Sequence, residues 1–496
     1  MLVFLLGSYV YAQEPELPKL TVNWNKTVRV STTTATLQVV VNPPLRQGTT
    51  VHDAAFRALR ELQADYVRYV PWLPYPRLGV AELQPPSEGK TSWDFSIIDP
   101  MTIDFLDATK GHPVVLNFST IPQWMYKTET PVTYPVDPNK VAWNYEQGTD
   151  LRDPTAQEVA AYYARLFSWY TAGGFTDELG KRHESNYHFA IPYWEVLNEV
   201  DFEHRMSPET YTRIYDSVVT AMRAVQPNTK FVGMALAAPS EEPSFFAYFL
   251  NHKNHRAGVP LDYISYHFYA NPNASETLDT EQYTFFAQAD GFLHVVRYIE
   301  ALRQQLSPET GTMINEIGSI AAEDGAQGES GYVFKPIASS YWHLSGALYA
   351  YVFGELSRLG IEVAGESQLV GYPTQYPSVS LVDWETGQPN ARFWVLRLLK
   401  DNFGPGDKIV DGSSQSDDVY ALPVETLAGE RRILLVNKRQ RGRVIEVPGA
   451  TGAQIESVDL TTDALPSAKA KLNSDKISLG GFSVAVVTLS RPESSW

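Results

Sequence analysis

The feature that most limits the fold is a repeated alternation of short apolar runs with amphipathic segments from residue 36 onward. Runs that are apolar throughout indicate strands buried on both faces, as in a parallel sheet. The segments between them have helical periodicity, as at 155–170, 208–225 and 281–305. Eight such strands in series favour a closed (β/α)8 barrel over an open, doubly wound sheet. The expected strands lie near residues 36–41, 66–70, 113–118, 193–199, 231–235, 263–268, 312–316 and 347–352.

The domain boundaries follow from where this alternation starts and stops. A helix expected over 390–399 would close the barrel, and short β-rich segments separated by turn residues follow it. We therefore expect an α/β fold with a catalytic (β/α)8 TIM barrel over 36–400 and an accessory C-terminal β-sandwich over 401–496. Strands within 20–35 are expected to join that sandwich.

The N-terminus carries the pattern of an export signal. Residues 1–12 are apolar, end in a small-x-small motif and precede a polar, Pro-rich stretch, although a basic residue at the start is missing. This predicts a signal peptide and a secreted protein. Sequons at Asn25, Asn117 and Asn273 are compatible with secretion, but such tripeptides are common by chance.

The composition excludes several kinds of chemistry. The 496 residues contain no cysteine, which excludes disulfides, thiolate metal sites and a cysteine nucleophile. The formal net charge is −17 and no long basic run occurs, so neither nucleic acid nor a membrane is expected as a partner. His252 and His255 lie in a polar loop without a carboxylate at useful spacing, which favours a solvated turn. We expect no metal and no cofactor.

Two glutamates occupy the positions where a barrel carries its chemistry. Glu199 ends the fourth expected strand and Glu316 the seventh, and each follows an asparagine. The C-terminal ends of all strands meet at one mouth, so the two carboxyl groups should approach each other there. Cleavage of a glycosidic bond needs such a pair, one protonated and one ionised. Asn198 could bind the sugar hydroxyl beside the anomeric carbon.

The chain resembles clan A of the glycoside hydrolases, and within it family 39, the β-xylosidase and α-L-iduronidase family. The resemblance extends in order over residues 36–400 and implies that Glu199 is the acid/base and Glu316 the nucleophile. It also implies that Arg68 holds the nucleophile ionised and that His267 lies near the sugar or the nucleophile. The stretches that carry the resemblance are 66–68, 93–99, 194–199, 261–267 and 313–316.

The chain also departs from the family pattern. The family usually has Pro after the acid/base, where this chain has Val200, and His two residues after the second-strand Arg, where it has Val70. Residues 201–205 do not follow the usual continuation either. These differences leave the chemistry in place and the identity of the sugar open.

Aromatic side chains are expected at the barrel mouth, because sugar rings present apolar faces. Trp124 and Tyr269 are the predicted substrate-binding members of a set that also includes Trp72, Tyr75 and Trp342.

A glycine-rich loop at 325–331 lacks the Lys-Ser/Thr of a phosphate cradle, and a lid over the sugar is the better interpretation.

The favoured interpretation is a retaining glycoside hydrolase that removes terminal sugars from carbohydrate substrates by a double displacement. An endo-acting clan A glycanase remains open, because loops set the number of subsites. A non-catalytic carbohydrate-binding barrel also remains open, although the presence of both glutamates argues against it. The sequence does not determine the oligomeric state.

Overall fold

The structure is a computed structural model that describes residues 17–490 except 131, 144, 146–147, 274–275, 323, 325–335 and 374–375. The predicted signal peptide and the glycine-rich loop at 325–331 therefore lie outside the described residues, and both stay predictions. Within the described part, no helix combines the length and apolar character that crossing a bilayer requires.

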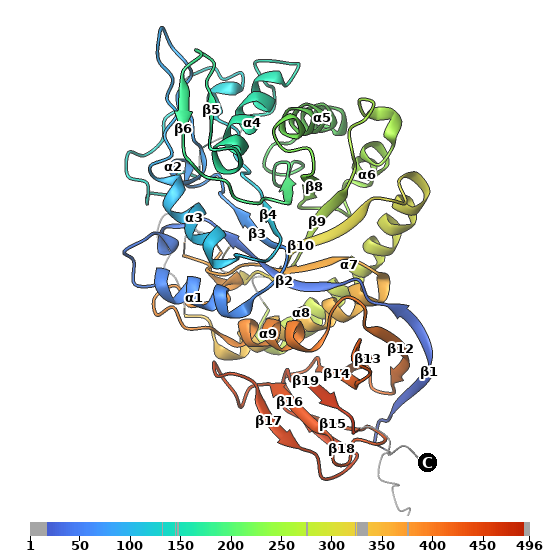
Figure 1. The fold of residues 1–496 in the computed structure, drawn as a ribbon. Helices are drawn as coiled ribbons and strands as arrows, with labels where there is room; N and C mark the ends of the chain where they lie inside the picture. Colours follow the sequence, from blue (N-terminus) through green and yellow to red (C-terminus); the bar gives the residue numbers. More distant parts are fainter. Residues whose placement is uncertain are drawn as a thin grey trace, which may run out of the picture.

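Eight parallel strands form a closed barrel, which confirms the predicted (β/α)8 class. Helices surround the barrel on the outside (Figure 1). In spatial order the strands are β10 (Gly311–Ser319), β11 (Val363–Glu366), β2 (Thr34–Val40), β3 (Val67–Val70), β4 (Val114–Leu116), β7 (Tyr193–Glu195), β8 (Lys230–Leu236) and β9 (Tyr263–Ala270).

The helices follow the predicted amphipathic segments closely. On α1, for example, the buried residues Phe56, Leu59 and Leu62 pack into the apolar core. The α-helices are α1 (His52–Leu62), α2 (Pro76–Gly79), α3 (Ile98–Ala108), α4 (Gln157–Thr171), α5 (Pro208–Val225), α6 (Pro243–Phe249), α7 (Leu278–Leu306), α8 (Ser339–Leu359) and α9 (Ala391–Asn402). Short 3-10 helices are η1 (Pro43–Leu45), η2 (Gln123–Met125), η3 (His252–Asn254) and η5 (Pro377–Val379).

The eighth strand is not where the sequence pattern placed it, and the prediction of a strand at 347–352 is wrong. That run lies inside α8, which is buried along most of its length between the barrel and the C-terminal domain. An apolar run without polar interruptions does not distinguish a buried helix from a buried strand. The true eighth strand is β11, whose four residues include Gly365 and the charged Glu366.

The C-terminal strands form a separate β-rich domain packed below α8 and α9 (Figure 1). A seven-stranded antiparallel sheet has the order β1-β12-β13-β14-β19-β16-β17, and β15 pairs with β18. The first member, β1, comes from the N-terminus and pairs with β12. These strands are β1 (Leu20–Val30), β12 (Lys408–Ser414), β13 (Val419–Glu425), β14 (Arg431–Asn437), β15 (Arg443–Glu446), β16 (Gln454–Val458), β17 (Ala468–Lys471), β18 (Lys476–Leu479) and β19 (Val484–Thr488).

The barrel is filled at the end where its strands begin. Val115, Val232, Met313 and Val363 form a small apolar cluster there, backed by tyrosines at the strand starts. This packing leaves the opposite end, where the strands finish, as the place for polar chemistry. A short hairpin of β5 (Gly174–Thr176) and β6 (Arg182–Glu184) extends from the segment between α4 and β7.

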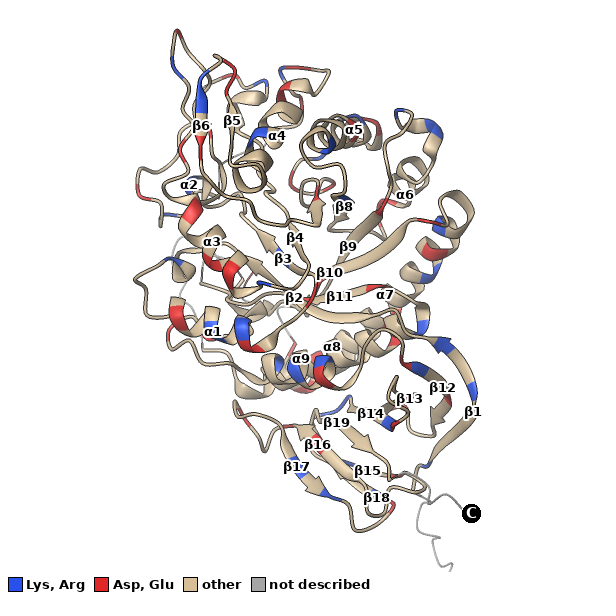
Figure 2. Ribbon diagram, in the orientation of Figure 1, with Lys and Arg blue, Asp and Glu red and all other residues tan. Residues whose placement is uncertain are grey.

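Charged residues fall mainly on outer helices and loops, with acidic and basic segments interspersed (Figure 2). This distribution fits a solvated surface. The prediction of a solvated turn holds for one of the two loop histidines. His252 is exposed at the start of η3, and its ring nitrogen lies 2.9 Å from Glu309. The side chain of His255, in contrast, is buried and contacts Asp216 at 2.7 Å. Asn117 is fully buried, which excludes glycosylation of that sequon in the folded protein.

Candidate active site

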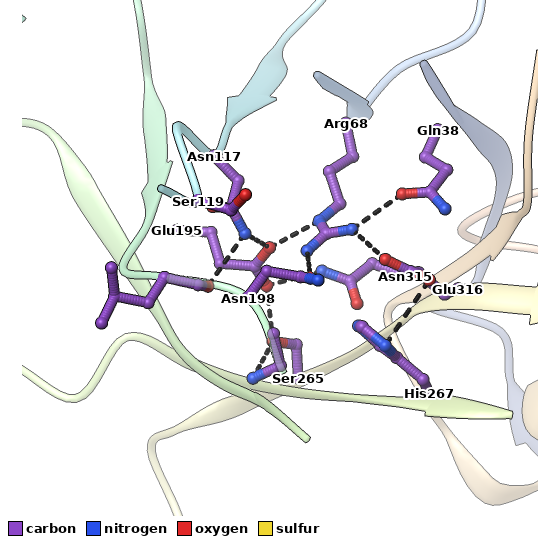
Figure 3. A network of polar contacts seen from close by, with 12 residues as sticks. Gln38, Arg68, Asn117, Ser119, Glu195, Asn198, Ser265, His267, Asn315 and Glu316 are labelled. Carbon is purple, nitrogen blue, oxygen red and sulfur yellow. Dashed lines mark hydrogen bonds and ion pairs between the residues drawn. The ribbon is translucent and has the colours of Figure 1, made fainter. Parts of the chain in front are cut away.

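The barrel strands bring most of the predicted residues together at one pocket. Asn198, Glu199, Tyr269 and Glu316 line it, and Arg68 and His267 contact these glutamates without lining it. β3 supplies Arg68, the segment after β7 supplies Asn198 and Glu199, β9 supplies Tyr269, and β10 supplies Glu316. Figure 3 shows how the polar side chains from these strands point toward one another. The fold therefore gathers residues that are separated by up to 248 positions, as Arg68 and Glu316 are.

Glu199 and Glu316 approach each other, as predicted. A carboxylate oxygen of each lies within 4.8 Å of the other and of a ring nitrogen of His267. His267 Nδ1 is 3.0 Å from Glu199 Oε1 and 3.5 Å from Glu316 Oε2, so the imidazole bridges the pair. The carboxyl groups of Glu199 and Glu316 and the imidazole of His267 therefore face one another across a few ångströms.

Arg68 lies beneath Glu316, as the resemblance implied. Its Nη1 is 2.5 Å from Glu316 Oε1, and the guanidinium is almost completely buried. Tyr269 donates its hydroxyl to the other oxygen, Glu316 Oε2, at 2.6 Å. Both oxygens of Glu316 are thus held by donors, which fixes the position of the carboxylate and favours its ionised form.

A third glutamate, Glu195, holds Arg68 in place and was not identified as functional from the sequence. Arg68 Nε donates to its Oε2 at 2.5 Å. Asn117, Ser265 and Asn315 also donate to this carboxylate, at 2.5 to 2.6 Å. The available signal was an acidic residue inside an otherwise buried strand, since such a charge requires partners.

The backbone around Glu199 is unusual for residues other than glycine. Leu197 has φ of 66° and Glu199 has φ of 41°, both in the left-handed region. Such conformations cost free energy and persist where the surrounding contacts enforce them, often at functional sites. Here the backbone N–H of Glu199 donates to Ala235 on the neighbouring strand, which ties the turn to β8.

The two carboxyl groups of the pair have pKa values shifted in opposite directions. Burial alone would raise the pKa of Glu316, but the charges of His267 and Arg68 outweigh it, and the pKa lies below its usual value. Burial raises the pKa of Glu199, the charge of Glu316 adds to the rise, and the hydrogen bond to His267 opposes it without reversing it. The two environments therefore favour the protonated form of Glu199 and the ionised form of Glu316.

The pocket around this pair has a volume of about 280 Å³ and an aromatic wall. Trp72 and Tyr269 line it, as predicted, and Trp143 and Tyr376 line it as well. The indole rings of Trp72 and Trp143 meet edge to face at 5.3 Å. Trp143 and Tyr376 belong to no sequence motif, because only the fold brings their loops to the mouth of the barrel.

Three other aromatic predictions find no support in the structure. Trp124 does not line the pocket; its indole N–H donates to the Glu82 carbonyl, and Arg152 covers its ring. Tyr75 is buried. Trp342 lies near the start of α8 and lines a different hollow beside the C-terminal domain.

Glu199, His267 and Glu316 are the one group of three whose ligand atoms converge closely enough for a metal ion within the described residues. Arg68 already occupies one oxygen of Glu316 and Tyr269 the other. A cation would have to share this carboxylate with a guanidinium, so the donor set does not fit a metal site well.

Comparison with known proteins identifies the family to which the chain belongs. Residues 10–308, more than half of the chain, match the family described as glycosyl hydrolases family 39, and the chain belongs to that family. It is therefore a glycosidase of the clan A type. No match is found among curated proteins.

Solved structures share the fold at low sequence identity. A GH51 arabinofuranosidase from Xanthomonas axonopodis pv. citri has a TM-score of 0.65 at 11% identity, covering 96% of this chain and 100% of that one. An α-L-arabinofuranosidase from Thermotoga maritima, in an arabinose complex, has a TM-score of 0.60 at 13% identity, covering 95% and 99%. A GH30 endoxylanase from Clostridium papyrosolvens C71 has a TM-score of 0.56 at 13% identity, covering 95% and 100%.

Proposed function

We propose that the protein is an exo-acting, retaining glycosidase in which Glu316 is the nucleophile and Glu199 the acid/base. The observation that carries this proposal is the close approach of the two carboxylates in opposite environments. Retaining enzymes have carboxyl groups about 5–5.5 Å apart, whereas inverting enzymes need about 6.5–9.5 Å to admit a water. The oxygens within 4.8 Å support retention.

The reaction would proceed in two displacements. Ionised Glu316 attacks the anomeric carbon while Glu199 gives its proton to the departing glycosidic oxygen, and a glycosyl ester of Glu316 forms. Glu199, now ionised, takes a proton from water, and the resulting hydroxide attacks the same carbon and releases Glu316. Esterification removes the negative charge of Glu316, so the pKa of Glu199 falls and suits it to act as a base.

Neighbouring side chains support each step. Arg68 and Tyr269 hold Glu316 by one oxygen each, and the lone pairs left on the carboxylate remain for attack. Asn198 accepts a hydrogen bond from Arg68 through Oδ1, so its amide nitrogen is the group that can bind the sugar hydroxyl beside the anomeric carbon. That bond would strengthen as the transition state develops.

The size of the pocket supports exo action. A volume of about 280 Å³ is just below the usual range of ligand pockets, roughly 300–1,000 Å³. Such a pocket suits one terminal sugar better than an extended chain. Two of the similar solved structures carry arabinofuranosidase in their names and one carries endoxylanase, so pentosides belong among the first substrates to test.

We also propose that the protein is exported, on the basis of the apolar segment at residues 1–12 and the small-x-small motif that ends it.

The test is a panel of aryl glycosides: β-xyloside, α-arabinofuranoside, β-galactoside, β-glucuronide and α-iduronide. We expect the wild-type protein to hydrolyse at least one of these glycosides and the Glu316→Gln variant to hydrolyse none. Action on xylan or arabinan should then release only monosaccharide at early times. Oligosaccharide products would favour the endo-acting alternative, and binding without hydrolysis would favour a carbohydrate-binding barrel.

A further inference from the structure

A fourth carboxyl group, Glu203, lies beside the catalytic pair. The backbone N–H groups of Phe202 and Glu203 both donate to the Glu199 carbonyl, at 2.9 and 2.7 Å. This tight turn directs Glu203 back into the pocket that Glu199 lines. The neighbouring Asp201 anchors the turn by accepting from the backbone N–H groups of Ala237 and Ala238. Glu203 is therefore held in place by the fold.

One oxygen of Glu203 organises its surroundings. Glu203 Oε1 accepts from the Trp72 indole at 2.5 Å and from Asn198 Nδ2 at 2.8 Å. Arg68 donates to Asn198 Oδ1, so hydrogen bonds hold both the oxygen and the nitrogen of the Asn198 amide. Its remaining N–H then has a fixed direction, so Glu203 determines how Asn198 meets a sugar.

The other oxygen of Glu203 has no hydrogen-bond partner in the part of the chain that the structure describes. Glu203 Oε2 is buried and lacks a hydrogen bond within the described residues, and the same holds for the indole N–H of Trp143. Both residues line the pocket. Buried polar groups in native proteins are normally paired, and unpaired ones at a binding site indicate that a ligand or water supplies the partner. A sugar hydroxyl both donates and accepts, and it can satisfy either group.

We propose that Glu203 is a sugar-recognition residue that restricts the pocket to uncharged glycosides, with Oε2 bound to a hydroxyl of the sugar in contact with Glu316. This inference rests on the proposed function. A uronic acid would bring a second carboxylate beside the ionised Glu316 in this buried pocket. The described lining residues include no Lys or Arg to neutralise it, and Arg68 is committed to Glu195 and Glu316.

The experiment compares two neutral glycosides with their uronides, β-glucoside with β-glucuronide and β-galactoside with β-galacturonide, together with the best aryl glycoside of the panel. We measure kcat and KM for the wild type, for Glu203→Gln and for Glu82→Gln. Glu82 is a buried carboxyl outside the pocket, so its variant is the matched control for replacing an acid by an amide.

We expect the wild type to prefer each neutral glycoside over its uronide by at least about 100-fold in kcat/KM. Glu203→Gln should lose about tenfold or more on the best glycoside, chiefly through KM, and the control should match the wild type. A monodeoxy glycoside lacking the recognised hydroxyl should be poor for the wild type but lose little further in Glu203→Gln, a coupling that a purely structural role would not produce.

Two results would overturn the inference while leaving the function intact: efficient wild-type cleavage of a uronide, or a Glu203→Gln variant within twofold of wild type on neutral substrates. Absence of hydrolysis of every glycoside by the wild type would instead contradict the proposed function, and the inference with it. Circular dichroism and thermal unfolding confirm that each variant is folded.

Discussion

Glu199 and Glu316 are chemically identical side chains, and the different roles that we propose for them follow from their neighbours. Arg68 and Tyr269 hold Glu316, whereas Glu199 meets only the imidazole of His267 among the described contacts of its carboxylate. The sequence located both glutamates from the apolar runs that precede them. The predicted strand ends were inexact, because β7 ends at Glu195, before Glu199, and β10 continues past Glu316 to Ser319. The sequence did not reveal Glu195 or Glu203, because their importance comes from contacts with side chains that are distant in the sequence.

Replacing either glutamate should therefore have different consequences. Glu316→Gln should abolish hydrolysis, because an amide cannot form the glycosyl ester. Glu199→Gln should lose roughly 10²–10⁴-fold with poor leaving groups and much less with activated aryl leaving groups, which need little protonation. Steady-state rates on both substrate types provide the measurement. An equal loss on both would assign the acid role to another residue.

The opposite pKa shifts predict the pH dependence. The proposed mechanism requires Glu316 to be ionised and Glu199 to be protonated. The pKa of Glu316 is lowered and that of Glu199 is raised relative to the ordinary glutamate value of about 4.3. The active form is therefore populated over a pH range whose lower limit is set by Glu316 and whose upper limit is set by Glu199. We expect a bell-shaped profile of kcat/KM with an acidic optimum, its limbs belonging to the coupled pair. A profile that keeps rising to pH 9 would contradict the mechanism.

Glu82 provides a stability test away from the chemistry. Burial, with a hydrogen bond to Glu178, raises its pKa from 4.5 to about 9. The folded protein thus keeps a proton that the unfolded chain releases, so the contribution of Glu82 to stability falls as pH rises through this window. An amide at this position does not titrate, so Glu82→Gln has no such pH-dependent loss of stability. Its free energy of unfolding relative to that of the wild type should increase from pH 5 to pH 9 in denaturant titrations. A difference that is constant with pH would refute the assigned shift.

At the scale of elements, predictability followed the clarity of local signals. The α5 helix was placed correctly because Ser207 caps it, Pro208 begins it and its apolar residues have helical spacing. The α8 helix was misread because its middle is almost uniformly apolar, which removes the periodicity that separates helix from strand. The strand β11 was missed because it is short and carries Gly365 and a buried charge.

That buried charge belongs to an ion pair that closes the barrel. Glu366 on β11 and Arg392 on α9 lie 2.9 Å apart and are both fully buried. Arg392→Met should lower the free energy of unfolding by about 3–5 kcal/mol, because it leaves Glu366 buried without its partner. The deficit should be smaller in acid, where a protonated Glu366 needs no counter-charge; its pKa is about 7 even when paired, because burial outweighs Arg392.

Arg397 on the same helix is the matched control, since its contacts are partly exposed: an ion pair with Asp401 at 3.6 Å and a position over the Trp394 ring at 5.9 Å. Arg397→Met should change stability by less than about 1 kcal/mol. Equal effects of the two substitutions in denaturant titrations would show that the buried pair does not stabilise the closure.

At the scale of the whole molecule, one apolar core joins the two domains. Residues of α8 and α9 and of the seven-stranded sheet belong to the same buried cluster, with Leu356, Leu396, Leu434 and Val486 among them. The β1 strand adds a second link, because the chain passes from the C-terminal sheet directly into the first barrel strand. The sequence predicted this architecture in outline, but not that the domains would share a core.

The family match covers Glu199 but ends at residue 308, before Glu316. The nucleophile is therefore assigned from geometry, and it is the claim that most needs a direct measurement. A 2-deoxy-2-fluoro glycoside of the preferred sugar, with an activated leaving group, slows the second displacement and traps the glycosyl-enzyme. Intact-mass spectrometry should show one added fluorosugar, and peptide mapping should place it on Glu316, with no adduct in Glu316→Gln. An adduct on any other residue, or turnover of the parent glycoside with inversion and no trapped adduct, would contradict the account.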